Sequence, residues 1–233
     1  MAIYNHSTKE LLENDLSSGS LIEASILNSD LDNLDCNNTL WIKTDMGDTN
    51  CNDAIFNITE LSNCVFHRSS FINSRFNKCK FNNSSFSGVS LIKVKFNNTK
   101  IIAQTIESCT MQRAEINYSI IQNSSFKDFE GVYTKLNNSV FINCTFEINY
   151  GSGMNGFSSA DITNCIFINC NFNGYPLRGA NTSKCTFAGC SGEITDDITA
   201  DTTNGIPFVY SQETKLIQNR EKALEILKEG QNG

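Results

Sequence analysis

Phenylalanine recurs at every fifth residue from Phe66 to Phe86, and this period constrains the fold more than any other feature of the chain. The spacing extends in both directions, because every fifth residue from Leu11 to Phe146 is apolar except Gly131. An α-helix repeats its apolar face about every 3.6 residues, and a half-buried strand repeats it every 2. A strict period of five therefore predicts neither an ordinary helix nor a simple alternating strand.

A second series, two places before the first, consists mainly of small residues such as Cys64, Ser69, Ser74, Cys79 and Ser84. Large and small inward residues that alternate in this way are what a narrow, square-sectioned coil requires. The large side chains fill its axis and the small ones fit at its corners. The expected aromatic core consists of Phe56, Phe66, Phe71, Phe76, Phe81, Phe86, Phe96, Phe126, Phe141, Phe146, Phe167 and Phe187.

The chain resembles the pentapeptide-repeat family over residues 11–190. The closest local matches are Ala24-Ser-Ile26, Ala54-Ile-Phe56, Ala114-Glu-Ile116 and Ala160-Asp-Ile162. The resemblance implies an all-β solenoid, a right-handed quadrilateral β-helix with twenty residues per coil and about nine coils. The chain departs from the family pattern by placing Asn after the central residue. Because Asn tolerates the left-handed conformation, we expect these residues to hold the turns; they include Asn73, Asn83, Asn98, Asn143 and Asn169.

The regions outside the regular repeat predict four further elements. Residues 1–10 are expected to form an N-terminal cap, and residues 147–156 a loop where the phase slips by one residue. Residues 191–210 are expected to form an acidic connector. Residues 211–230 predict an α-helix, whose Leu216, Leu224 and Leu227 would cover the open end of the coil or support a homodimer.

Charge is distributed unevenly along the chain, whose net charge is -7. Residues 1–60 and 147–233 are acidic, whereas residues 61–146 are basic. The overall balance makes direct nucleic-acid binding an unfavoured expectation. The sequence shows neither an apolar leader nor a membrane-spanning stretch, so we expect a cytoplasmic protein.

The basic middle of the chain contains the first candidate binding residues. A coil of twenty residues stacks Arg75 under Lys95 and Lys80 under Lys100 on adjacent faces, with Lys78 and Lys93 nearby. Such columns suit an acidic protein surface or phosphates, and the alternative is charge that only keeps a β-face soluble.

The phase-slip loop contains the remaining candidate binding residues. These are Tyr150, Gly151 and Gly153. Loops on rigid scaffolds commonly bind ligands, and the alternative is a tolerated surface insertion.

All ten cysteines fall at inward positions, which predicts that they are buried packing residues. The sharper alternative concerns Cys165, Cys170, Cys185 and Cys190, which would form two stacked pairs and serve as weak candidates for a metal site or disulfides. His6 and His67 have no nucleophile or orienting partner in the pattern. We therefore expect no catalytic residues and no cofactor.

The favoured hypothesis is a non-enzymatic protein-interaction module that binds through flat faces. The family resemblance implies two alternatives. One is a DNA mimic that dimerises through its C-terminal end and protects type II topoisomerases such as gyrase from quinolones or toxins. The basic middle argues against it, since a DNA mimic needs a continuous negative surface. The other is a bacterial effector delivered into a host cell.

Overall fold

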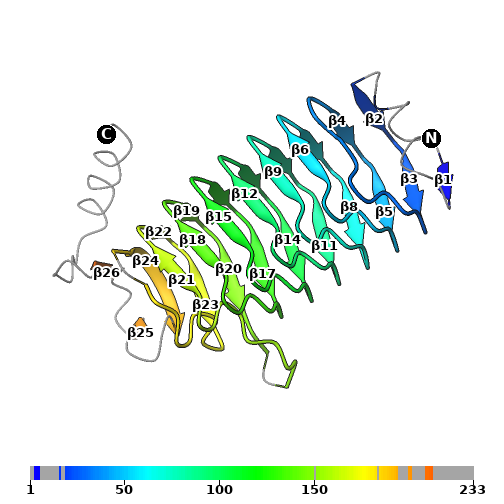
Figure 1. The fold of residues 1–233 in the computed structure, drawn as a ribbon. Helices are drawn as coiled ribbons and strands as arrows, with labels where there is room; N and C mark the ends of the chain where they lie inside the picture. Colours follow the sequence, from blue (N-terminus) through cyan, green and yellow to red (C-terminus); the bar gives the residue numbers. More distant parts are fainter. Residues whose placement is uncertain are drawn as a thin grey trace.

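The chain winds into a parallel β-solenoid whose strands pair with strands one coil away (Figure 1). The computed structural model describes residues 3–5, 16, 19–149, 151–182, 184–193, 199–200 and 208–211. Residues twenty apart lie in register, as Phe76 with Phe96 and Phe66 with Phe86 show. The predicted twenty-residue coil is confirmed.

Each coil has four sides, which we number as faces 1 to 4 in chain order. Face 1 contains β2 (Ser20–Ile22), β4 (Leu40–Ile42), β7 (Glu60–Ser62), β10 (Lys80–Asn82), β13 (Lys100–Ile102), β16 (Ile120–Gln122), β19 (Val140–Ile142), β22 (Ile166–Ile168) and the first half of β24 (Thr186–Glu193). Face 2 contains β1 (Ile3–Asn5), β3 (Ser25–Leu27), β5 (Asp45–Gly47), β8 (Val65–His67), β11 (Ser85–Ser87), β14 (Thr105–Glu107), β17 (Ser125–Lys127), β20 (Thr145–Glu147) and β23 (Asn171–Asn173). Face 4 contains β6 (Ile55–Asn57), β9 (Arg75–Asn77), β12 (Lys95–Asn97), β15 (Glu115–Asn117), β18 (Lys135–Asn137) and β21 (Asp161–Thr163). Face 3 is held by isolated parallel bridges, such as Ser70 to Ser90 and Thr110 to Glu130.

The core is a continuous stack of large side chains along the solenoid axis. All twelve predicted phenylalanines are buried. Phe76 stacks between Phe56 and Phe96, with ring centroids 4.6 and 5.0 Å away, and the Phe66 and Phe86 centroids are 4.7 Å apart. Aromatic side chains at the same position of successive coils therefore stack on one another.

The corners are held by small polar side chains that bond the preceding coil. Ser74 Oγ donates to the Cys51 carbonyl at 2.7 Å and accepts the Ala54 amide at 3.1 Å. These contacts satisfy hydroxyls that would otherwise be buried without partners. The turns also behave as predicted, because all five asparagines expected to hold them have positive φ, including Asn73 at 60° and Asn143 at 52°.

The loop after β20 contains six extra residues, which corrects the prediction of one. Phe126 pairs with Phe146, twenty residues on, but Phe146 pairs with Phe172, twenty-six residues on. A period of five cannot distinguish an insertion of one residue from one of six, since both shift the phase equally. Five of the six extra residues therefore keep the period in the sequence although they belong to the loop.

Gly131 interrupts the apolar series because two neighbouring positions exchange size. Phe129 occupies a small position and is fully buried, and its ring centroid lies 4.7 Å from that of Phe157. A Cβ on Gly131 would lie 2.6 Å from Phe157 Cδ1, so only glycine fits beneath this ring. The exchange keeps the core volume nearly constant.

The C-terminal part of the repeat continues further than expected. β24 runs to Glu193, and β25 (Thr199–Ala200) and β26 (Phe208–Ser211) both pair antiparallel with it. Residues 191–210 therefore contain strands and are not simply a connector. The predicted helix, at residues 211–230, lies outside the described residues except Ser211, and the predicted cap contains β1, which pairs with β3. Within the described part of the chain, no helix is long and apolar enough to cross a membrane.

Candidate functional site: a basic groove between faces 3 and 4

A groove follows the corner where face 3 turns into face 4. One wall comes from turn residues with positive φ, such as Lys93 and Arg113, each at 57°. The other comes from the first residues of the face 4 strands, two positions later in each coil. The residues that line this basic groove are Asp53, Asn73, Arg75, Lys93, Lys95, Arg113, Glu115, Tyr133 and Lys135. The volume of the groove is about 520 Å³.

Five cations line the basic groove and two carboxylates face them. Lys95 Nζ lies 3.2 Å from Glu115 Oε2, and both side chains are partly exposed. Among the described residues, the other cations of the groove make no ion pair. The groove therefore keeps an excess of positive charge that its own carboxylates do not neutralise.

The repeat itself stacks these charges along the groove. Arg75 pairs in register with Lys95, Lys95 with Glu115, and Glu115 with Lys135. Neighbouring coils are separated by about 4.8 Å, so adjacent charges interact even through solvent. Tyr133, with 60% of its surface exposed, lies toward the C-terminal end of the groove and adds an aromatic ring with a polar tip.

The structure divides the six predicted basic residues among three surfaces. Arg75, Lys93 and Lys95 lie in the basic groove. Lys80 and Lys100 pair in register on face 1, and Lys80 Nζ is 3.1 Å from Glu60 Oε1. The sixth, Lys78, has φ of 54° at the turn from face 4 to face 1.

Sequence reasoning missed the other half of the groove. Arg113 follows Lys93 by one coil of twenty residues and Lys135 follows Lys95 by two, so extending the predicted columns by one and two coils would have found them. The acidic members and Tyr133 were missed for the same reason.

The comparisons with known proteins agree with this architecture. Residues 44–83 and 69–101 match the family model for pentapeptide repeats, with eight copies. The same register runs through the described coils on both sides of that region. The chain contains pentapeptide repeats. No curated protein matches it.

Two solved structures are similar to this pentapeptide-repeat protein. HetL, described as a pentapeptide-repeat protein involved in heterocyst differentiation regulation in the cyanobacterium Nostoc, is 13% identical with a TM-score of 0.53, over 78% of this chain and 94% of HetL. QnrB1, described as a plasmid-mediated fluoroquinolone resistance protein, is 12% identical with a TM-score of 0.46, over 79% of this chain and 92% of QnrB1. At 13% identity, the likeness to HetL shows the fold alone.

The inserted loop of this pentapeptide-repeat protein borders a second hollow. Gly151 and Gly153 have φ of 92° and 73° and line it together with Met154, Tyr175 and Arg178. Predicted Tyr150 lies outside the described residues. The lining mixes backbone, a thioether and a single cation, so it has no concentrated charge comparable with that of the basic groove.

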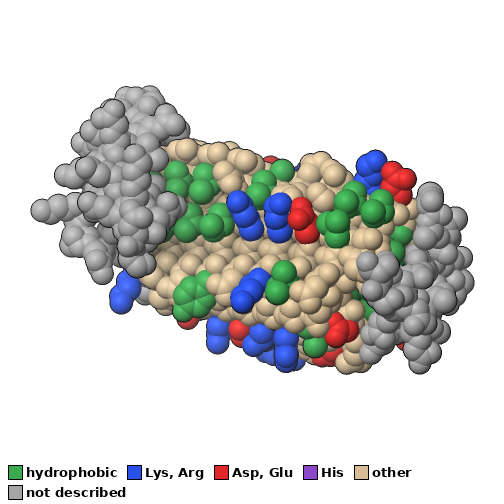
Figure 2. All heavy atoms as spheres, turned by 90° about the horizontal axis from the view of Figure 1, so that it is seen from above, with side chains coloured by type: hydrophobic (Ala, Val, Ile, Leu, Met, Phe, Trp, Pro, Cys, Tyr) green, Lys and Arg blue, Asp and Glu red, His purple; other side chains and the backbone are tan. Residues whose placement is uncertain are grey.

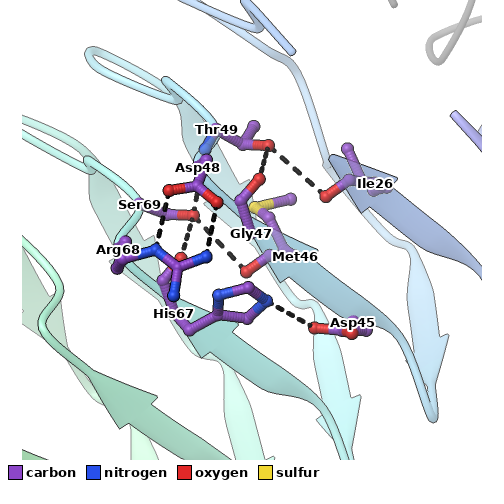
Figure 3. A network of polar contacts seen from close by, with 9 residues as sticks. All are labelled: Ile26, Asp45, Met46, Gly47, Asp48, Thr49, His67, Arg68 and Ser69. Atoms are coloured by element: carbon purple, nitrogen blue, oxygen red, sulfur yellow. Dashed lines mark hydrogen bonds and ion pairs between the residues drawn. The ribbon is translucent and has the colours of Figure 1, made fainter. Parts of the chain in front are cut away.

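Near the N-terminal coils, charged side chains pair with one another across coils (Figure 3). Arg68 donates two hydrogen bonds to Asp48, at 2.8 and 2.7 Å, and holds the pKa of Asp48 below its usual value. His67 Nε2 lies 3.2 Å from Asp45 Oδ1, and its ring lies where a Cβ on Gly47 would otherwise be. These contacts link neighbouring coils on face 2 and at the corner that follows it.

All ten cysteines of this pentapeptide-repeat protein are buried as reduced thiols. Their thiols behave like the corner hydroxyls, as Cys79 Sγ donates to the Phe56 carbonyl at 3.1 Å. Burial raises the pKa of Cys79 and of Cys109 to about 11. The candidates Cys165 and Cys185 stack on each other, as do Cys170 and Cys190. Within the described ranges, no group of three or more His, Cys, Asp or Glu side chains is placed to hold a metal ion.

Proposed function

We propose that this pentapeptide-repeat protein is a non-enzymatic interaction module that binds an acidic segment of a protein partner in the basic groove. The observation that carries the proposal is the row of cations along one corner of a rigid solenoid. Of the five cations in the groove, only Lys95 forms an ion pair within the described part of the chain. Acidic side chains supplied by a partner would complete the ion pairs that the groove lacks.

The shape of the groove fits an extended segment. From Asp53 to Tyr133 the groove spans five coils, so its length is about 19 Å at about 4.8 Å per coil. An extended chain advances about 3.3 Å per residue, so about six residues fill this length. Arg75 and Arg113 suit carboxylates in particular, because a guanidinium binds them through two parallel hydrogen bonds.

The charge beyond the groove favours a short protein segment over a long nucleic acid. The coils on the N-terminal side contain Asp30, Asp32 and Asp35 on faces 3 and 4. A polyanion that extended past the groove in this direction would be repelled, whereas a short acidic segment stays within the basic coils.

The same charge pattern argues against DNA mimicry, because a continuous negative surface is interrupted at the groove. Protection of a topoisomerase and delivery as an effector are supported by the family resemblance only. We also propose that the protein is cytoplasmic and that it has no catalytic site.

Fluorescence anisotropy with labelled probes tests the class of partner. The full-length protein is titrated with an acidic peptide of about ten residues and with a single-stranded oligonucleotide of similar length. We expect the peptide to bind in a salt-dependent manner and the oligonucleotide to bind at least about tenfold more weakly. The reverse order would replace the protein partner by a nucleic acid, and no binding of either probe would refute the proposal.

A further inference from the structure

A cluster of aliphatic side chains points outward from face 1, at positions that are mostly polar elsewhere in the repeat. Six of the eight outward positions on β13, β16, β19 and β22 are apolar, and the other two are Lys100 and Gln122. We call this cluster the isoleucine surface; it contains Ile102, Ile120, Val140, Ile142, Ile166 and Ile168. Figure 2 shows hydrophobic side chains gathered on one face toward the C-terminal end of the solenoid. Ile120 is exposed and the other five side chains are partly exposed, and a contiguous apolar surface of this kind on a β-face indicates a contact site.

The size of the isoleucine surface fits one helix. Four strands about 4.8 Å apart, with their side chains, span about 15 to 20 Å. A helix that rises 1.5 Å per residue covers this length with about 10 to 13 residues. A standard protein interface buries about 800 Å² on each partner, which is far more than a surface two side chains wide provides. A dimer held by this surface alone is therefore a poor fit.

The chain itself leads a suitable segment to the isoleucine surface. β22 pairs with β24, and β24 pairs with β26, so the last described residues extend the same sheet. Ser211 is paired with Thr186, which in turn is paired with Ile166 of the isoleucine surface. Two strand spacings, about 10 Å, therefore separate the end of β26 from the surface. Four residues, 212–215, are long enough to cover that distance.

The sequence after β26 has the pattern of an amphipathic helix of the required length. Leu216, Ile217, Ala223, Leu224 and Leu227 fall within one stripe at 100° per residue. Leu216 to Leu227 spans twelve residues, or about 18 Å of helix. Arg220 lies in the same stripe, where its aliphatic stem can cover apolar surface while its guanidinium stays in water.

Charge sets the direction in which such a helix would lie. Lys100 pairs in register with Ile120 at the far end of the isoleucine surface and makes no ion pair within the described part of the chain. A helix that starts beside β26 and runs along face 1 brings its C-terminal turn, with Glu229, to Lys100. Cations are stabilising at a helix C-terminus, where the carbonyl groups have no intrahelical partner.

We propose that residues 216–229 fold back as a helix onto the isoleucine surface of their own chain, with the C-terminal turn beside Lys100. The contact covers the apolar part of face 1 and leaves the basic groove open. It is independent of the proposed function, because the two sites share no residue.

Hydrogen exchange of the full-length protein, read out by mass spectrometry, tests this contact. Amides of residues 217–227 are expected to exchange at least about tenfold more slowly in the protein than in a free peptide of residues 212–233. The protection should be lost in the double variant Ile142→Asp/Ile166→Asp and in Leu224→Asp, and it should weaken in Lys100→Glu. The matched control is Ile72→Asp/Ile92→Asp, which places the same charges on outward positions of face 3 and should leave the protection unchanged.

Three results would overturn the proposal. The first is a tail that exchanges as fast as the free peptide, and the second is protection that survives the face 1 double variant. The third is protection that appears only as protein concentration is raised about a hundredfold, which would assign the surface to the tail of a second copy. The Leu224→Asp change lies outside the solenoid, so it keeps the test valid even if the double variant fails to fold.

Discussion

Arg75 and Lys95 occupy the same register position on the neighbouring strands β9 and β12, so two cations stack one coil apart. Like charges directly opposite each other on a sheet destabilise it. Glu115 lies beside Lys95 at 3.2 Å, whereas Arg75 has no ion pair within the described ranges. The groove thus holds a charge arrangement that costs stability, which is understandable if a partner supplies the missing anions.

Neutralising Arg75 is therefore expected to stabilise the free protein. Arg75→Gln should raise the free energy of unfolding by a few tenths of a kcal/mol at low ionic strength, and the gain should vanish near 1 M salt. Denaturant unfolding at both salt concentrations measures it. Arg68→Gln is the control. Arg68 is paired with Asp48, so this substitution should not raise the free energy of unfolding. Destabilisation by Arg75→Gln would contradict this reading of the groove.

The aromatic stack predicts a large cost for losing one ring. Phe76 is buried between Phe56 and Phe96 and stacks on both rings. Phe76→Ala therefore leaves a cavity and removes the stacking partner of each neighbouring ring. We expect a loss of about 3 to 5 kcal/mol in the free energy of unfolding, measured by denaturant or thermal melts. Phe76→Leu, which refills most of the volume, should lose clearly less. An unchanged melt for Phe76→Ala would refute the register.

Face 4 contains a ladder of asparagine amides that should stabilise the stack of coils. Asn97 Nδ2 donates to Asn77 at 3.0 Å and its Oδ1 accepts from Asn117 at 3.1 Å. Asn97→Ala removes both bonds, so it should cost about 1 to 2 kcal/mol. Asn137→Ala removes the one ladder bond described there, to Asn117, and should cost about half as much. Equal costs measured for the two variants would show that the ladder bonds do not set the effect.

The buried thiols predict a loss of stability at alkaline pH. Burial raises the pKa of Cys79 and Cys109 from the ordinary value of 9.0 to about 11. In the unfolded chain these thiols ionise near pH 9, whereas in the folded protein they stay protonated until about pH 11. Their contribution to the free energy of unfolding is therefore complete below pH 9 and is lost as the pH rises toward 11. The loss is at most about 2 to 3 kcal/mol per thiol.

Substitution of these thiols isolates their contribution from that of other alkaline titrations. Under reducing conditions, Cys79→Ser/Cys109→Ser should flatten the fall in unfolding free energy between pH 9 and 11, relative to the unsubstituted protein. Serine is the matched replacement, because it occupies equivalent corners such as Ser74 and Ser84. Identical pH curves for the two proteins would exclude these two thiols as the cause.

The architecture could be predicted from the sequence because a five-residue period determines which positions of each repeat face inward and which face outward. The stack of Phe56, Phe76 and Phe96, the buried cysteines and the positive φ at Asn73 all follow from position within the repeat. Once the coil length is twenty, the register of Arg75 under Lys95 follows as well.

Features that depend on neighbours outside the period could not be predicted in this way. The loop after β20 shifts the phase by the same amount whether it holds one extra residue or six. β25 and β26 pair antiparallel with β24, and nothing in a parallel repeat indicates such a pairing. The register can place Lys93, Arg113, Arg75 and Lys135 near the same corner, but it does not show that this corner is hollowed into a groove.

The basic groove is tested most directly as the binding site by comparing two triple variants of equal net charge for binding of the acidic peptide. Lys93→Glu/Lys95→Glu/Arg113→Glu reverses the basic groove, and Lys78→Glu/Lys80→Glu/Lys100→Glu reverses the basic residues outside it. We predict that the groove variant binds at least about tenfold more weakly and loses most of its salt dependence, while the other variant stays within about threefold of the unsubstituted protein. Equal weakening of both variants would show that only overall charge matters and would contradict the groove as the binding site.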